Sequence, residues 1–155
     1  MTELLAMFTR AHKLLRAAAD DAMRKHGVRV GQNIVLEVLW EADGLTPGEL
    51  AARLHVTTPT IVNTATRMEN AGLLTRRRDT QDARLVRLYL TDQARAAQQP
   101  IEEARQQLEQ RAFATLTSQE RRHLCSALTK IIQVMGDESP SVSNTSPRNG
   151  AETGG

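Results

Sequence analysis

The stretch "TPGELAARLHVTTPTIVNTATRMENAGL", Thr46 to Leu73, decides the fold because it carries the start and stop signals of two successive helices. In the first, Thr46 can cap the free backbone amides and Glu49 has the spacing of a capping box. The second is predicted to be capped by Thr58 and to end at Gly72, and each helix has a proline in its first turn. Two short helices joined by a few residues predict a helix-turn-helix.

The second of these helices has one apolar face and one polar face. Ile61, Ala65 and Met68 recur at helical spacing, so they are predicted to face the core. The opposite face carries hydroxyl, amide and guanidinium groups, which can hydrogen-bond base edges and phosphate oxygens. The candidate DNA-binding residues on this helix are Thr57, Thr58, Thr60, Asn63, Thr64 and Arg67. Polarity alone fits a solvated helix face equally well, and the basic segment that follows favours nucleic acid.

That following segment, "RRRDTQDARLVRLYLT", runs from Arg76 to Thr91 and reads as part of a β-hairpin. Strands are predicted at 74–78 and 84–90, separated by turn residues, with apolar and polar residues alternating in the second strand. A hairpin attached to a helix-turn-helix resembles a wing. Charge also protects an edge strand without any ligand, so the wing arginines are not all assigned to DNA. Arg76 and Arg78 are the candidates for phosphate contacts.

Outside this lobe, which spans about 45–91, the sequence is helical. Helices are predicted from the N-terminus to Gly27, over 30–40, from Thr91 onward with a kink at Pro100, and from a capping box at Thr117. The outer helices carry more apolar surface than one small chain can cover. Residues 1–136 are predicted to form one domain, and 137–155, rich in Ser, Pro and Gly, to be a disordered tail.

Composition limits the function. Residues 53–95 carry eight arginines and four acids, net +4, although the whole chain carries only +2, so one surface is expected to meet a polyanion. The chain has 3% aromatic residues, too few for stacking platforms, which favours duplex over single-stranded nucleic acid. One cysteine and no signal or membrane-spanning pattern predict a cytoplasmic protein with no membrane contact.

The element order, with "TPGELAARL", "MENAGLLTRRRD", "DAR" and "LYLT", resembles the MarR family of bacterial transcriptional regulators. The resemblance implies a mainly α fold with a small β-wing: a winged helix-turn-helix lobe joined to long dimerisation helices. It also implies a homodimer on a pseudo-palindromic operator in double-stranded DNA, and most often a ligand-responsive repressor. By the same resemblance, the helix from Thr58 enters the major groove, Arg84 reaches the minor groove and Asp82 orients the wing tip.

The family also implies a small phenolic or other anionic effector, bound between the dimerisation helices and the lobe. Candidate pocket residues are His12, Arg16 and Trp40, although residues of these types are more often polar interface groups, for the first two, and a core residue, for Trp40. Cys125 lies beside the apolar stripe of the last helix and is predicted to be a small buried hydrophobe.

Other classes of function have less support from the sequence. No nucleophile with its base and no phosphate-binding glycine loop is present, so the chain is predicted not to be an enzyme and to need no cofactor. Its four histidines are dispersed, which predicts no metal site. The alternative to DNA binding is a protein-interaction module that uses a winged helix to dock another protein.

Overall fold

The computed structural model describes residues 2–138 of the chain. It divides into two compact units, Met1–Thr115 and Leu116–Gly155, which are considered separately below. The sequence predicts one unit through residue 136, whereas this division lies before the last helix. The predicted disordered tail falls mostly on residues 139–155, outside the described residues, and Asp137 and Glu138 continue the last helix.

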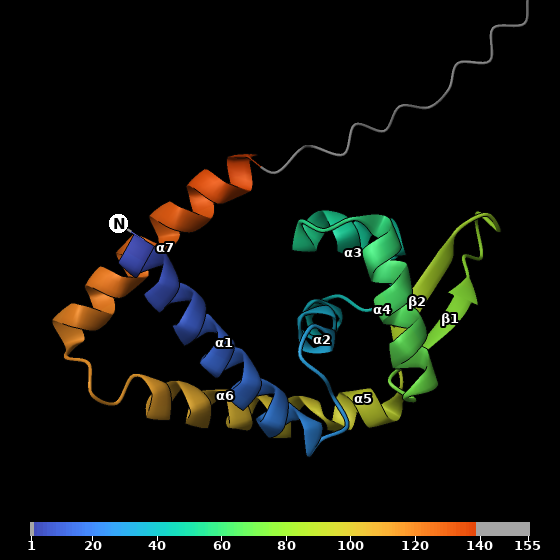
Figure 1. Ribbon diagram of the computed structural model, residues 1–155. Coiled ribbons are helices and arrows are strands. Elements are labelled where there is room, and N and C mark those ends of the chain that lie inside the picture. The colour runs from blue at the N-terminus through green and yellow to red at the C-terminus, as the bar shows by residue number, and fades with distance from the viewer. Residues whose placement is uncertain (1, 139–155) are drawn as a thin grey trace, which may run out of the picture. The chain divides into compact units, whose positions relative to one another are not determined.

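The first unit contains every element of the predicted lobe and the helices that flank it (Figure 1). Its helices and strands are α1 (Thr2–Arg24), α2 (Gln32–Glu41), α3 (Pro47–Leu54), α4 (Thr58–Asn70), β1 (Leu74–Arg78), β2 (Val86–Leu90), α5 (Asp92–Ala96) and α6 (Gln98–Ala112). The second unit contains α7 (Ser118–Glu138). The mainly α fold with a two-stranded wing is therefore confirmed.

The core of the first unit sits where α2, α3 and α4 meet the base of the hairpin. Leu36, Leu50 and Met68 come from these three helices and are fully buried, together with Leu88 of β2. Ile61 and Ala65 of α4 join them at 2% and 1% exposure, as the spacing predicts. These contacts fix the orientation of α4, so its opposite face is held rigidly toward solvent.

The capping signals in the sequence act as predicted in α3 and α7. Thr46 Oγ1 accepts from the Glu49 N–H, and a Glu49 carboxylate oxygen accepts in return from the Thr46 N–H. The same reciprocal pair joins Thr117 and Glu120 at the start of α7. For α4 the prediction is wrong by one residue: Thr57 is the cap, because its Oγ1 accepts from the Thr60 N–H, and Thr58 is the first helical residue.

The wing is an antiparallel pair in which Leu74 lies opposite Leu90 and Arg78 opposite Val86. The second strand begins at Val86, two residues later than predicted, because Arg84 and Leu85 belong to the turn. There the Asp79 N–H donates to the Leu85 carbonyl at 2.9 Å. Leu88 also bridges to Leu45, which ties the chain before α3 to the hairpin.

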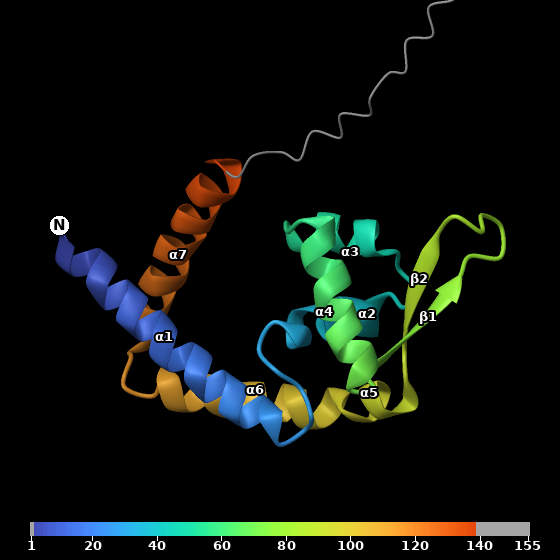
Figure 2. The same ribbon diagram turned by 45° about the vertical axis from the view of Figure 1, so that its right-hand side comes forward.

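The long helix after the wing is interrupted, as the proline predicts. α5 ends at Ala96 and α6 begins at Gln98, with a turn residue between them. Pro100 has no N–H for the Ala96 carbonyl and its ring crowds that carbonyl, so the regular helix stops there. Beyond the break, α6 packs against α1 (Figures 1 and 2).

Both units leave large apolar side chains exposed. On α1, Leu4, Leu5 and Leu14 are 74%, 70% and 62% exposed, and on α7, Ile132 is 69% exposed. Cys125 of α7 is also exposed, so the prediction of a buried cysteine is wrong for this chain. The physical reason is that α7 is the only helix of its unit among the described residues and has no second element there to bury its stripe.

Candidate nucleic-acid interface

The exposed face of α4 is the centre of the candidate site. Val62, Asn63, Thr66 and Arg67 are all exposed on it. The side chains of Asn63 and Arg67 have no hydrogen bond or ion pair with the part of the chain that the structure describes. An amide and a guanidinium without intramolecular partners are therefore available to an external ligand.

The threonines of α4 are less available than the sequence suggests. Thr57 Oγ1 and Thr60 Oγ1 lie 2.8 Å apart and hydrogen-bond each other at the start of the helix. Both are exposed, so they can still accept from or donate to a phosphate. Thr58 is exposed in the first turn, as predicted.

Thr64 lies away from the outward face of α4. It is half-buried and lines a hollow on the side of α4 that faces the entry to α2. The helical period explains this position, because Thr64 follows the buried Ile61 by three residues and precedes the buried Ala65 by one. This geometry argues against Thr64 as a DNA contact.

Thr66 and Val62 are exposed residues of α4 that the sequence reasoning did not select. Thr66 Oγ1 donates to the Val62 carbonyl at 3.0 Å and receives a hydrogen bond from Arg76 Nη2 at 2.6 Å. The spacing of four residues from Val62 to Thr66 places both on one flank of α4, outside the apolar stripe of Ile61, and was the signal that could have identified them.

The wing arginines differ in how they are held. Arg76 Nε lies 2.9 Å from Glu69 Oε2, so this guanidinium ties β1 to α4. Arg77 stacks over the Tyr89 ring at 5.1 Å from its centroid. Arg87 binds Asp79 and the Gly44 carbonyl. Arg78 is exposed and has no side-chain partner among the described residues, which leaves it available for a phosphate.

Two aspartates shape the wing tip. Asp79 Oδ1 accepts from the N–H groups of Gln81 and Asp82, and its second oxygen accepts from Arg87. The Arg87 guanidinium and the two N–H groups lower the pKa of Asp79 from its ordinary 3.8 to about 2. The carboxylate is thus charged at neutral pH and holds the turn closed.

Asp82 and Arg84 form the second contact of the tip. Arg84 Nε and Nη2 donate to the two oxygens of Asp82 at 3.1 and 3.2 Å, and the Arg84 N–H donates to the same carboxylate. These bonds from Arg84 lower the pKa of Asp82. The arginine nevertheless stays 90% exposed, so Asp82 orients a guanidinium that remains open to solvent.

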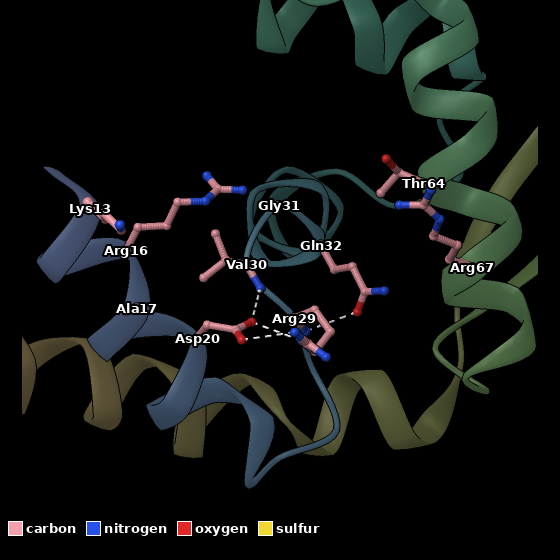
Figure 3. A pocket seen from close by; sticks show the side chains of 10 residues that line it. All are labelled: Lys13, Arg16, Ala17, Asp20, Arg29, Val30, Gly31, Gln32, Thr64 and Arg67. Atoms are coloured by element: carbon pink, nitrogen blue, oxygen red, sulfur yellow. Dashed lines mark hydrogen bonds and ion pairs between the residues drawn. The ribbon is translucent and has the colours of Figure 1, made fainter. Parts of the chain in front are cut away.

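A hollow of about 610 Å³ lies between α1, the entry to α2, and α4 (Figure 3). Its charged lining comprises Lys13, Arg16, Asp20, Arg29 and Arg67. Of the predicted pocket residues, only Arg16 is there. His12 is not among the lining residues, and Trp40 packs against the core with its Nε1 donating to the Ala94 carbonyl at 3.1 Å.

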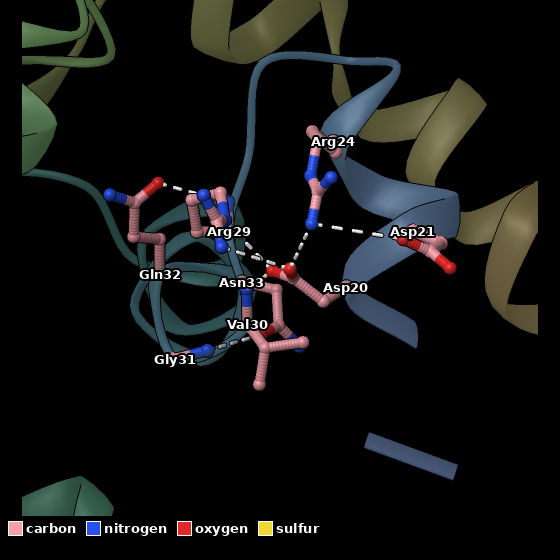
Figure 4. Close-up of polar contacts among 8 residues, drawn as sticks. All are labelled: Asp20, Asp21, Arg24, Arg29, Val30, Gly31, Gln32 and Asn33. Carbon is pink, nitrogen blue, oxygen red and sulfur yellow. Dashed lines mark hydrogen bonds and ion pairs between the residues drawn. The ribbon is translucent and has the colours of Figure 1, made fainter. Parts of the chain in front are cut away.

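Asp20 fastens α1 to the segment that enters α2 (Figure 4). Its carboxylate accepts from Arg29 Nε and Nη2, from the Val30 N–H, each at 3.0 Å, and from Arg24 Nη2 at 2.9 Å. Arg29 is the first cause of a pKa well below the ordinary range, and the Val30 N–H and Arg24 add to it. Lys13, Arg16 and Arg67, by contrast, have no such partner in the described chain.

Comparisons with known proteins agree with this architecture. The sequence model of the MarR family matches residues 31–86, from the start of α2 into β2. The HTH-type transcriptional regulator TtmR of Methylorubrum extorquens is 36% identical over 90 residues, which are 58% of this chain and 46% of that protein. The chain thus spans about half the length of this relative. The HTH-type transcriptional repressor MdtR of Bacillus subtilis is 28% identical over 73% of each chain.

Solved structures share the fold. A MarR transcriptional regulator from Methanosarcina mazei Go1 has a TM-score of 0.73 at 17% identity, covering 87% of this chain and 97% of the other. Reduced AbfR bound to DNA has a TM-score of 0.66 at 21% identity, covering 86% and 91%. The two relatives named above are regulators of transcription and not enzymes, in agreement with the sequence prediction. No helix among the described residues is long and apolar enough to cross a membrane. The match of the MarR family model over residues 31–86 and the identity with TtmR support the MarR family for this chain, and the solved structures share its winged-helix fold.

Proposed function

We propose that this protein is a sequence-specific, double-stranded DNA-binding regulator of transcription. The observation that carries the proposal is the pair Asn63 and Arg67, both exposed and without intramolecular partners, on a helix held by a buried core. An asparagine amide and an arginine guanidinium are the side chains that read adenine and guanine edges in the major groove. The wing adds Arg78 for phosphate and Arg84, which can reach a narrow minor groove.

The names of the similar proteins agree with a DNA-binding regulator of transcription. TtmR and MdtR are named as helix-turn-helix regulators of transcription, and AbfR, which shares the fold, has been solved on DNA. MdtR is named a repressor. We infer repression for this chain as well, acting in the cytoplasm, where DNA is accessible to it.

The protein is proposed to bind as a homodimer. Exposed apolar side chains on α1 and α7, such as Leu5 and Ile132, are unfavourable in water and are typical of surfaces that a second subunit covers. A two-fold dimer would present two copies of α4 to successive major grooves. Half-sites about 10 base pairs apart follow from that geometry.

The hollow beside α4 is the proposed effector site. Its cationic lining includes Lys13, Arg16 and Arg67, and the apolar surface of Ala17 and Val30 lies beside them. This combination suits a small aromatic or other organic anion. Because Arg67 belongs to both the hollow and α4, an anion that binds it competes with DNA for the same guanidinium.

DNA binding is tested by selecting duplexes from a randomised pool and measuring the affinity of the winners by electrophoretic shift at several salt concentrations. The expected result is a pseudo-palindromic consensus and an affinity that falls as salt rises. Binding without any sequence preference would contradict the proposal. Failure to bind any duplex would instead favour the alternative, a winged helix that docks a protein.

The effector proposal is tested with benzoate, an aromatic carboxylate, against its neutral counterpart benzamide. Benzoate should raise the melting temperature and weaken operator binding, whereas benzamide should do neither, because a ligand stabilises the native state it binds. Replacing Arg16 by Gln should reduce the benzoate effect without changing DNA affinity in its absence. Equal responses to both compounds would remove the hollow as an anion site.

A further inference from the structure

Val62 is an exposed apolar residue on the face of α4 that is proposed to meet DNA. It lies in the second turn of the helix, next to Asn63, and its side chain is 36% exposed. Ile61, the preceding residue, lies about 100° around the helix and is only 2% exposed. Val62 therefore lies outside the buried core, on the flank of the polar face of α4, with part of its side chain open to solvent.

Three of the four exposed threonine hydroxyls near Val62 are already hydrogen-bonded, the exception being Thr58. Thr57 and Thr60 bond each other at 2.8 Å, and Thr66 both donates to the Val62 carbonyl and accepts from Arg76. Among the exposed side chains of the first two turns of α4, the Thr58 hydroxyl and the Asn63 amide have no partner in the described chain, and Val62 adds its aliphatic methyl groups beside them. In helix-turn-helix proteins, residues near the start of the recognition helix contact base edges.

In the major groove of B-DNA, the one apolar group on a base edge is the C5-methyl of thymine. We propose that Val62 packs against a thymine methyl, so that each half-site carries a T·A pair beside the base read by Asn63. The inference rests on the proposed DNA-binding function and adds the base class that this helix prefers. A singly exposed valine occurs on many protein surfaces, so the test must address the methyl group itself.

The experiment replaces each thymine of the pool-selected half-site, one at a time, by deoxyuridine, which lacks only the methyl. For the wild-type protein, one position per half-site should show about a fourfold loss of affinity, the value expected for one buried methyl-sized group. For Val62→Ala, the same replacement should cause no loss. Val86→Ala is the matched control, because Val86 is also 36% exposed but lies on the wing strand β2, and it should keep the full loss.

Both variants remove exposed methyl groups, so melting temperatures close to the wild-type value should confirm that they fold. Two results would overturn the inference while leaving DNA binding intact: no thymine whose methyl matters, or a loss that persists in Val62→Ala. A pool that yields no preferred sequence would contradict the proposed function itself, and with it this inference.

Discussion

At the residue scale, the wing tip depends on one carboxylate that orients one guanidinium. The Asp82 carboxylate accepts hydrogen bonds from both Nε and Nη2 of Arg84, yet the arginine side chain remains 90% exposed. Such an arrangement lowers the entropy that Arg84 would lose on entering a groove, because its side chain is already restricted. The other wing arginines are committed to protein groups, with the exception of Arg78.

Replacing Arg84 by Ala should therefore weaken operator binding by roughly 1–3 kcal/mol, the range for a well-formed groove contact. Arg77→Ala is the control within the same wing, because this substitution removes the same charge and Arg77 is held over the Tyr89 ring. The measurement is the difference in affinity between the two variants at one salt concentration. Equal losses would mean that only net charge matters and that Arg84 has no contact of its own.

Gly44 is a second residue on which the lobe depends. Its φ is +75°, a left-handed value, and a Cβ there would lie 2.8 Å from Cε1 of the Tyr89 ring. Gly44→Ala should lower the free energy of unfolding by at least about 1–2 kcal/mol, because an L-residue is strained in this conformation. Urea denaturation measures the change.

Gly48 provides the comparison for Gly44, since a Cβ there would meet only Thr46 Oγ1, at 4.0 Å. It lies inside α3, where alanine is favoured over glycine by about 0.5–1 kcal/mol. Gly48→Ala should leave stability unchanged or raise it. If Gly44→Ala were equally harmless, the contact between Tyr89 and the turn would not be the constraint described above.

At the element scale, the wing turn is closed by the charged form of Asp79. Its pKa is about 2 in the folded chain and near 3.8 when unpaired, so the folded state gains stability from it above pH 4. That contribution is lost as the pH falls from about 4 to about 2, because the unfolded chain binds the proton first. Asp82 shifts in the same direction and adds to the loss.

Asp79→Asn should therefore be less stable than the wild type at neutral pH and should lose less stability than the wild type between pH 4 and pH 2. Urea midpoints across this range give the comparison. Asp92→Asn is the control, because the Asp92 side chain has no hydrogen bond or ion pair in the described part of the chain. Parallel curves for Asp79→Asn and the wild type would show that the turn does not depend on this charge.

The elements that local signals specify could be predicted from the sequence. Thr46 and Glu49 marked the start of α3, Pro100 marked the break before α6, and Gly72, at φ +76°, marked the end of α4. Each of these depends on residues within four positions of each other. Where two neighbouring threonines could both cap α4, the sequence could not separate them, and Thr57 rather than Thr58 is the cap.

The hollow could not be predicted, because it depends on residues that only the fold brings together. Arg29 is nine positions from Asp20, and Arg67 is on another helix altogether. No periodicity links these three residues. His12 was selected as a pocket residue by its spacing from Arg16, but sharing a helix face with a lining residue does not place a side chain in the hollow.

At the scale of the whole molecule, the main feature still to be explained is the set of large apolar side chains that are exposed to solvent. The lobe buries its own core, whereas α1 exposes Leu4, Leu5 and Leu14 and α7 exposes Ile131 and Ile132. Such side chains contribute to stability only when something covers them. The proposed symmetric dimer would cover these side chains without any other protein.

Replacing Ile132, 69% exposed, by Glu should convert the proposed dimer to a monomer, because a carboxylate cannot be buried unpaired in an apolar interface. Lys130→Glu is the control on the same helix, because Lys130 is also exposed but carries a charge already, and it should remain dimeric. Sedimentation at micromolar concentration distinguishes the two states. The wild type should also melt at a temperature that rises with protein concentration, and Ile132→Glu should not. A wild-type protein that sediments as a stable monomer would show that the apolar stripe of α7 has another use, and operator binding through two half-sites would then lose its structural basis.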